Sequence, residues 1–260
     1  MSVSQPPLSL SGRVAVVTGG TSGIGRALSL ALAEAGADVV PSSRRRELVD
    51  SVAGEVEARG RRSLRVSCDV GDRRSLEEAL AAVLGSLGRV DILVNCAGRT
   101  KRQPTLEMSE ADWQAILDTN LLGTLRACQV FGRPMLERGW GRIVNVASLS
   151  SFVALFEVAA YAASKAAVAS LTKSLALEWG PRGVNVNAIA PGVFPTELNR
   201  ALLEGTGRGQ EFLQRTPLKR FGRVEELGGA AVFLSSEAAS FVNGEVLVVD
   251  GGFLASGVNQ

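Results

Sequence analysis

Short apolar runs alternate along the chain with segments whose apolar residues recur every three or four positions. Runs of this length that are rich in Val and Ile predict buried strands, and the longer spacing predicts amphipathic helices. The predicted strands are Arg13–Thr18, Asp38–Pro41, Leu64–Cys68, Asp91–Asn95, Arg142–Ala147, Asn185–Ala190 and Glu245–Asp250. The predicted helices are Gly25–Ala35, Glu47–Arg59, Ser75–Leu87, Glu110–Arg138 and Ala159–Trp179.

Strands that alternate with helices need crossover connections, which place helices on both faces of a parallel sheet. The pattern therefore predicts an α/β fold, a doubly wound Rossmann-type parallel sheet of seven strands with helices on both faces. No linker-like stretch divides residues 1–260, so we expect a single domain, with a flexible start at residues 1–9. Residues 191–217 form one irregular segment after a predicted strand. Ligands of such sheets bind at the carboxyl ends of strands, so we expect this segment to cover the substrate.

The first predicted strand is joined to the first predicted helix by a glycine-rich turn, TGGTSGIG at residues 18–25. Glycine lets the backbone turn sharply and approach a pyrophosphate, while the helix N-terminus offers amide donors and a positive dipole. Such a turn also occurs without a ligand, but its place after the first strand fits a dinucleotide site. The residues expected to bind the cofactor here are Gly19, Thr21, Ser22, Gly23, Ile24 and Gly25.

The second predicted strand is followed by a serine pair and three arginines, SSRRR at residues 42–46. An NAD site normally carries an Asp or Glu here that hydrogen-bonds the ribose 2′-hydroxyl. No acid is present, and Arg44, next to Ser43, can pair with a 2′-phosphate and cover the adenine. We therefore expect NADP(H) to be preferred over NAD(H), the alternative being a solvated basic start of the next helix.

Two further strand ends carry residues suited to the same cofactor. The third predicted strand ends in Asp69 and Val70, whose carboxylate and amide can hold the adenine edge. The fourth ends in Asn95, followed by Ala97 and Gly98, where small residues let the backbone pass close to the ribose. Both lie at carboxyl ends of strands, where this fold binds ligands.

The helix predicted at Ala159–Trp179 carries Tyr161 and Lys165 four positions apart, on one face. The chain has one tyrosine and no histidine, so acid–base chemistry near neutral pH must come from a group with a shifted pKa. A phenol has a pKa of about 10, and we expect a nearby ammonium, together with an oxidised nicotinamide, to lower it. Because such a pair is also common on surface helices, its neighbours decide between the two interpretations.

Two neighbours support a catalytic interpretation. Ser148 follows the fifth predicted strand, where its hydroxyl can hydrogen-bond the substrate oxygen. Asn120 lies inside the helix predicted at Glu110–Arg138, where its amide can bind a water that links Lys165 to solvent. Asparagine is a poor helix former, which favours a functional reason, although an ordinary mid-helix asparagine is the alternative. We expect Tyr161 to exchange a proton with the substrate oxygen.

In order and spacing, these motifs resemble the short-chain dehydrogenase/reductase family over residues 10–252. The matching motifs are TGGTSGIG, NCAG, Asn120, Ser148, YAASK and Pro191-Gly192. The resemblance implies a Ser–Tyr–Lys triad with Asn120 as a fourth member, and cofactor contacts from Tyr161 and Lys165. It also implies a homotetramer built through the two long helices and the C-terminal segment. The residues implied to line the nicotinamide amide are Pro191, Gly192, Val193 and Thr196. Cys96 stands where the family more often has a second asparagine, and we expect little effect.

The amino-acid composition limits the kinds of partner that we expect this chain to bind. A net charge of +2 does not suggest nucleic acid or an anionic membrane. No stretch approaches the roughly 20 apolar residues of a membrane-spanning helix, and the start has no signal-peptide pattern. Three widely spaced cysteines predict free thiols in a reducing cytoplasm, with no metal-ligand pattern. We therefore expect a cytoplasmic protein that binds a small molecule and no metal.

Candidate substrate residues lie beside the predicted active-site mouth: Arg99, Lys101, Arg102, Ser150 and Glu157. The three cations could receive an anionic substrate such as a sugar acid, or could simply be solvated charge. Glu157, four residues before Tyr161, could hydrogen-bond a hydroxyl-rich substrate. The chain resembles the gluconate-type and related sugar or polyol dehydrogenases of the family, which implies interconversion of a secondary alcohol and a ketone.

Two other functions stay open. The chain also resembles 3-oxoacyl-carrier-protein reductases, in which an acidic carrier docks on basic residues that Arg126 and Arg182 match. A cofactor-binding sensor without catalysis would be marked by loss of the tyrosine, lysine or serine, and all three are present. A sugar-nucleotide epimerase is disfavoured, because the chain lacks a separate C-terminal substrate domain.

Overall fold

The computed structural model describes residues 7–197 and 199–257, and residues 1–6 of the start expected to be flexible lie outside them. The strands are β1 Val14–Thr18, β2 Asp38–Ser42, β3 Ile92–Asn95, β4 Gly141–Val146, β5 Val184–Pro191 and β6 Val246–Val249. The helices are α1 Gly23–Glu34, α2 Arg46–Glu57, α3 Arg73–Leu87, α4 Glu110–Leu117, α5 Gly123–Arg138, α6 Ala159–Trp179, α7 Arg200–Leu203, α8 Gly207–Arg215 and α9 Gly228–Ser235. Short 3₁₀ turns lie at Thr105–Glu107, Leu149–Ser151, Gly180–Arg182, Val224–Leu227 and Glu237–Ala239, and a π-helical turn at Asp118–Leu122.

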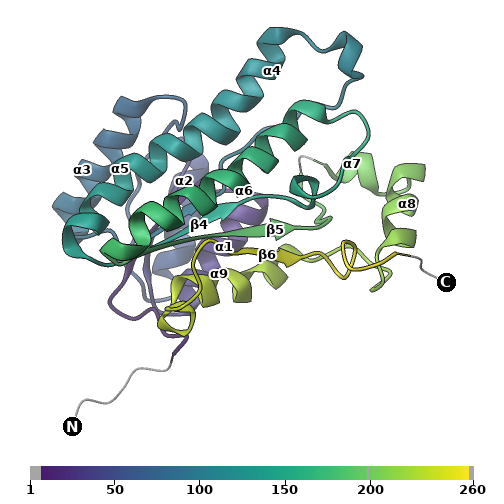
Figure 1. The fold of residues 1–260 in the computed structure, drawn as a ribbon. Helices are drawn as coiled ribbons and strands as arrows, with labels where there is room; N and C mark the ends of the chain where they lie inside the picture. Colours follow the sequence, from purple (N-terminus) through teal and green to yellow (C-terminus); the bar gives the residue numbers. More distant parts are fainter. Residues whose placement is uncertain (1–6, 198, 258–260) are drawn as a thin grey trace.

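Within the described residues the strands form one parallel sheet, in the order β2-β1-β3-β4-β5-β6. Apolar side chains of α1 and α9 pack on one face of this sheet, and those of α3, α5 and α6 on the other. Figure 1 shows α5 and α6 on one side of the strands and α1 and α9 on the opposite side. The predicted doubly wound, Rossmann-type fold is confirmed.

The sheet has six strands where the sequence pattern predicts seven. The segment predicted as a strand at Leu64–Cys68 runs beside β2, and Cys68 N donates to Ser43 O at 3.0 Å, but no regular ladder forms. Val39 N donates to Arg62 O on this edge, so the next donor would come from Pro41, which has no N–H. Proline in β2 therefore ends the sheet at that edge.

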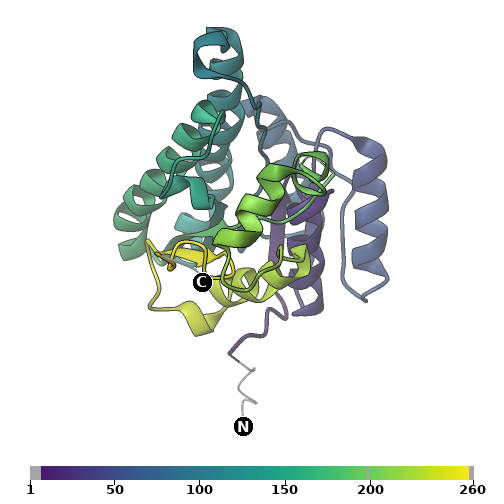
Figure 2. The same ribbon diagram turned by 90° about the vertical axis from the view of Figure 1, so that its right-hand side faces the viewer.

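The segment 191–217, expected to be irregular, contains α7 and α8. The side chain of Thr206 accepts from Gly209 N and begins α8, and Phe212 of that helix packs against Phe253 near the C-terminus. Leu203 and Leu149 complete this small apolar cluster, which joins the segment to the loop after β4. Figure 2, viewed from this side, shows α7 and α8 in front of the strand ends. This apolar cluster holds α7 and α8 against the loop that follows β4.

None of the helices in the described part of the chain is both long and apolar enough to cross a bilayer.

Candidate active site

The glycine-rich loop between β1 and α1 is folded against the residues that follow β3. Gly19 has a φ of 67°, and a Cβ there would come within 2.6 Å of Ala97 N. A Cβ on Gly25 would lie 2.0 Å from Gly19 O. Side chains at these positions would thus fill the loop, while the first turn of α1 offers backbone N–H donors. The loop fits the diphosphate of a dinucleotide.

The connection from β2 to α2 is tied to this loop by hydroxyls and one guanidinium. Thr21 Oγ1 donates to Ser43 Oγ at 2.8 Å, and Arg45 Nη2 donates to Ser22 Oγ at 3.1 Å. Arg44, the arginine singled out from the sequence, is exposed. Arg45 was missed because three consecutive arginines give no signal for which one turns toward the loop.

The strand ends named from the sequence lie around the same loop, but several of their polar groups are already paired. Asp69 Oδ1 accepts from Gly71 N at 2.9 Å, while Val70 is buried. Asn95 Nδ2 donates to Asn145 Oδ1 at 2.9 Å, between β3 and β4. Asn95 thus joins the ends of β3 and β4, and Asp69 holds the turn that follows it through one of its two carboxylate oxygens.

The start of segment 191–217 reaches the glycine-rich loop. Pro191 ends β5, and Gly192 N donates to Val249 O at 2.9 Å, followed by the half-buried Val193. A Cβ on Gly23 would lie 3.1 Å from Thr196 Cγ2. The residues expected to line the nicotinamide amide thus follow the carboxyl end of β5 and end against the loop that suits the diphosphate.

Ser148, Tyr161 and Lys165 come together at the carboxyl end of β4. Ser148 begins the turn Leu149–Ser151, where its Oγ accepts from Ser150 N at 3.1 Å, and its hydroxyl lies close enough to the Tyr161 phenol to lower the pKa of that group. Lys165 Nζ lies 5.8 Å from the Tyr161 ring centroid and donates to Val146 O at 2.6 Å. The first turns of α6 therefore present the phenol and the ammonium to one site, as their spacing predicts.

Burial shifts two pKa values in this site. Desolvation raises the pKa of the Tyr161 phenol, and the hydrogen bond with Ser148 offsets this only in part. Burial also lowers the pKa of Lys165 to about 8, opposed by its neighbour Cys96. In the chain by itself, burial therefore raises the pKa of the phenol, and the lowering expected from Lys165 together with a bound oxidised nicotinamide stays a prediction.

Asn120 lies inside the long predicted helix, in a π-helical turn that is continuous with α4 and α5. Gly123 N donates to Asp118 O, five residues back, and this turn separates α4 from α5. Asn120 Nδ2 donates to Arg99 O at 3.0 Å and to Ser164 Oγ at 2.9 Å, and Oδ1 accepts from Arg99 N at 2.8 Å. The amide thus fastens the loop after β3 to α6, and only a second lone pair of Oδ1 is left for the water expected from the sequence.

The candidate substrate residues are brought together only in part. Lys101 Nζ contacts Asp112 Oδ2 at 2.7 Å, and Arg102 Nε contacts Glu157 Oε2 at 2.8 Å. Arg99 is exposed, with its backbone held by Asn120. In the described part of the chain, the buried Ser150 Oγ has no hydrogen-bond partner.

Two residues near Glu157 were missed from the sequence. Arg208 of α8 donates from Nη1 to Phe156 O at 3.1 Å. Gln103 N donates to Glu157 O at 2.8 Å. Both contacts join segments about 50 residues apart, so no local pattern could predict them.

Within residues 7–197 and 199–257, no group of three acidic, cysteine or histidine side chains could hold a metal ion.

Comparison with known proteins gives one consistent family. The family profile described as enoyl-(acyl carrier protein) reductase matches residues 19–254. The gluconate 5-dehydrogenase of Gluconobacter oxydans is 44% identical over 98% of this chain and 100% of its own. The D-threitol dehydrogenase of Mycolicibacterium smegmatis is 43% identical over 94% of each chain. The crystal structure of a gluconate 5-dehydrogenase from Burkholderia cenocepacia, in complex with NADP and tartrate, superposes with a TM-score of 0.93 at 39% identity, over 96% of this chain and 98% of its own.

Proposed function

Since this chain belongs to the short-chain dehydrogenase/reductase family, and is therefore a nicotinamide-dependent oxidoreductase that interconverts alcohols and ketones, we propose that Ser148, Tyr161 and Lys165 are its catalytic residues and that its substrate is a small polyhydroxylated compound. The observation that carries this proposal is the meeting of these three side chains at the carboxyl end of β4, beside the glycine-rich loop. Sugar acids and polyols are the substrates named for the relatives, and both are polyhydroxylated.

Proton transfer follows from the three side chains. In reduction, the Tyr161 O–H donates its proton to the substrate carbonyl oxygen, while the Ser148 hydroxyl hydrogen-bonds the same oxygen. In oxidation, the phenolate of Tyr161 takes the proton back from the alcohol. A bound nicotinamide supplies or accepts the hydride. Asn120 positions the site by holding the loop after β3 against α6.

The shifted pKa values suit this division of work. Because desolvation raises the pKa of Tyr161, the phenol is protonated at neutral pH and ready to donate. A pKa of about 8 keeps Lys165 mostly in its ammonium form at neutral pH. The ammonium of Lys165 favours the phenolate of Tyr161. This phenolate forms only when Tyr161 has given its proton to the substrate.

We propose NADP(H) as the preferred cofactor. The loop after β2 offers Ser43, Arg44 and Arg45 and no carboxylate to a ribose 2′-phosphate, and Arg45 already reaches Ser22 at the start of α1. The remaining cofactor residues of the proposal share the strand ends and glycine-rich turns described above: Gly19, Thr21, Ser22, Gly23, Ile24, Gly25, Asp69, Val70, Asn95, Ala97, Gly98, Pro191, Gly192, Val193 and Thr196.

The proposal extends to assembly and location. A homotetramer would cover Leu177 of α6 and Phe241, two large apolar side chains that are exposed in the single chain. Cys68, Cys96 and Cys128 are free thiols, which fits a reducing compartment such as the cytoplasm.

Replacing Tyr161 with phenylalanine tests the catalytic proposal. The variant lacks only the phenol oxygen, so we expect turnover to fall by roughly 10²–10⁴-fold because proton transfer is lost. Steady-state oxidation of NADPH with keto-sugars measures this, and NADPH fluorescence and circular dichroism serve as controls for cofactor binding and folding. Turnover close to that of the unmodified protein would rule out the mechanism.

A 3-oxoacyl-carrier-protein reductase is the second candidate function, favoured by the likeness to the 3-oxoacyl-[acyl-carrier-protein] reductase of Aquifex aeolicus, which is 39% identical over 94% of this chain. Of its two candidate docking residues, Arg126 is paired with Asp118 at 2.8 Å, whereas Arg182 is exposed. Turnover of acetoacetyl thioesters without turnover of polyols or sugar acids would select this function over the first.

A further inference from the structure

The turn Leu149–Ser151, which follows β4, contains a buried serine hydroxyl without a hydrogen-bond partner. Ser150 is 5% exposed, and its Oγ makes no hydrogen bond within the described residues. Burying a hydroxyl without a partner destabilises a fold, so native proteins keep few such groups, and each one that is kept needs an explanation. Ser150 therefore carries a hydroxyl that the fold itself does not use.

Two other serines, at the start and at the end of this turn, have structural contacts. Ser148 Oγ accepts from Ser150 N at 3.1 Å, and Ser151 Oγ donates to Lys165 O of α6 at 2.8 Å. Leu149 belongs to the apolar cluster that the turn shares with α7 and α8. The turn is thus fixed by its neighbours, and the position of Ser150 does not depend on its own hydroxyl.

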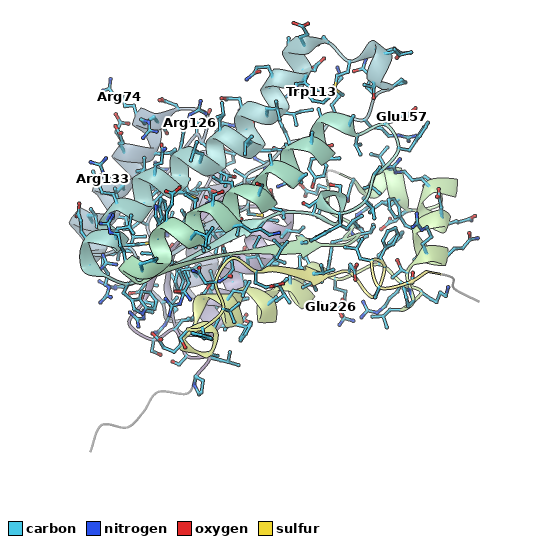
Figure 3. All side chains as sticks on the ribbon, viewed as in Figure 1. Arg74, Trp113, Arg126, Arg133, Glu157 and Glu226 are labelled. Carbon is cyan, nitrogen blue, oxygen red and sulfur yellow. The ribbon has the colours of Figure 1, made fainter. Side chains whose placement is uncertain are left out.

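Ser150 lies beside the proposed catalytic serine. A serine Oγ is no more than about 4 Å from the backbone N of its own residue, so Ser150 Oγ lies within about 7 Å of Ser148 Oγ. Since Ser148 Oγ accepts from Ser150 N, its O–H is left to donate to the substrate oxygen. Figure 3 shows Glu157, which follows this turn and precedes α6, on the side of the molecule that carries α7 and α8. The unpaired hydroxyl is therefore part of the surroundings of the reacting carbonyl.

The separation of the two hydroxyls decides what they can hold together. A hydrogen bond between hydroxyl groups spans about 2.8 Å, so two such bonds leave room only for two closely spaced oxygens of one substrate. In the proposed reaction Ser148 holds the carbonyl oxygen, and the second oxygen is then that of a hydroxyl on a neighbouring carbon. A methylene group at that place would leave Ser150 unpaired and shielded from water.

We propose that Ser150 is a specificity-determining residue whose hydroxyl binds a substrate hydroxyl on the carbon next to the reacting carbonyl. The proposal rests on the proposed function and narrows its substrate class. The site then selects α-hydroxy ketones, and the vicinal diols that they form on reduction, over carbonyl compounds without the adjacent hydroxyl.

Two four-carbon ketones test the proposal. Erythrulose carries hydroxyls on both carbons next to its carbonyl, whereas 4-hydroxy-2-butanone keeps only the distant hydroxyl. For the unmodified protein with NADPH, we expect kcat/KM to be at least about tenfold higher for erythrulose. In Ser150→Ala this ratio should fall by about tenfold, and the change in ratio cancels the difference in intrinsic reactivity between the ketones. The free energy of unfolding should not decrease in this variant, because the hydroxyl that it removes has no partner.

Ser235→Ala is the matched control. Ser235, the last residue of α9, is also a buried serine whose Oγ has no partner among the described residues. It lies two residues before Glu237, which contacts Arg13 and Arg142 beside the amino ends of β1 and β4, at the edge of the sheet opposite the site. This control should leave the ratio unchanged.

Three results overturn the inference but not the proposed function. They are an unchanged ratio in Ser150→Ala, an equal fall of the ratio in Ser235→Ala, and turnover of other keto-sugars without turnover of erythrulose. Turnover of thioesters alone overturns both.

Discussion

Lys165 carries its charge inside the protein. Its side chain is 5% exposed, and Nζ donates to Val146 O at 2.6 Å. Burial lowers its pKa from 10.5 to about 8, which means that keeping the ammonium there costs stability. The cost corresponds to about 3 kcal/mol at neutral pH. The proposed mechanism uses this charge beside Tyr161, so in that mechanism function and stability oppose each other at this residue.

Replacing Lys165 with methionine should separate the two effects. Between pH values of about 8 and 10.5, the unfolded chain binds more protons than the folded one. The free energy of unfolding of the unmodified protein therefore rises with pH across that range. Lys165→Met should lose turnover yet gain up to about 3 kcal/mol of unfolding free energy at neutral pH. The gain should shrink as the pH rises above about 8 and should vanish near 10.5. Urea unfolding at several pH values measures it, and a variant less stable at neutral pH would show that burial does not dominate.

The meeting of the three proposed catalytic residues was predictable because their spacing is local. Tyr161 and Lys165 share one face of one helix, and Ser148 follows an apolar strand, so periodicity alone brings them to the same end of the sheet. The direction of the Tyr161 pKa was not predictable. It depends on how many atoms surround the phenol, and those atoms come from several elements.

At the scale of elements, the proposed preference for NADP(H) rests on the connection between β2 and α2. Arg44 and Arg45 are both exposed there, and Arg45 also donates to Ser22 at the start of α1. We expect Arg45→Ser to raise KM for NADPH by about tenfold or more, since one charge-assisted hydrogen bond to phosphate is lost. Arg44→Ser is the matched control, with a smaller expected effect. Steady-state kinetics with NADPH and NADH measure both. If the unmodified protein uses NADH equally well, the assignment of NADP(H) fails.

Element boundaries were predicted where the hydrophobic pattern is strong and missed where single residues interrupt hydrogen bonding. Pro41 removes the donor that a seventh strand at Leu64–Cys68 would need, although that segment has the composition of a strand. The helix predicted at Glu110–Arg138 is helical throughout, but Asp118–Leu122 form a π-helical turn within it, and the one extra residue of this turn shifts the side chains that follow around the helix axis. The pattern of apolar residues reveals neither the missing strand nor the π-helical turn.

At the scale of the whole molecule, the exposed apolar side chains predict assembly. Asn243 Nδ2 donates to Ala176 O, so the segment that contains Phe241 lies beside the part of α6 that carries Leu177. We expect light scattering after gel filtration to give about four times the 27.2 kDa chain mass. Phe241→Asp should lower this mass by placing a charge in the interface. Leu106→Asp, at another fully exposed apolar residue, should leave it unchanged. A monomeric unmodified protein would end the tetramer proposal.

At this scale, the sequence could not predict contacts between segments that lie far apart along the chain. The motifs place Arg102 and Glu157 near one active-site mouth, but their pairing depends on how two loops are folded against α8. As isolated residues, the arginine favours an acid and the glutamate favours hydroxyls. Only the pairing shows that the two charges offset each other.

The single tyrosine of the chain gives this protein an internal optical probe. Since Tyr161 is the only phenol, any phenolate absorbance in the ultraviolet difference spectrum arises at the catalytic site and nowhere else. A titration followed at that band would read the ionisation of one catalytic group directly, without labels or substitutions. Adding NADP during the titration would show how far the bound cofactor shifts that ionisation, which most enzymes with several tyrosines do not allow.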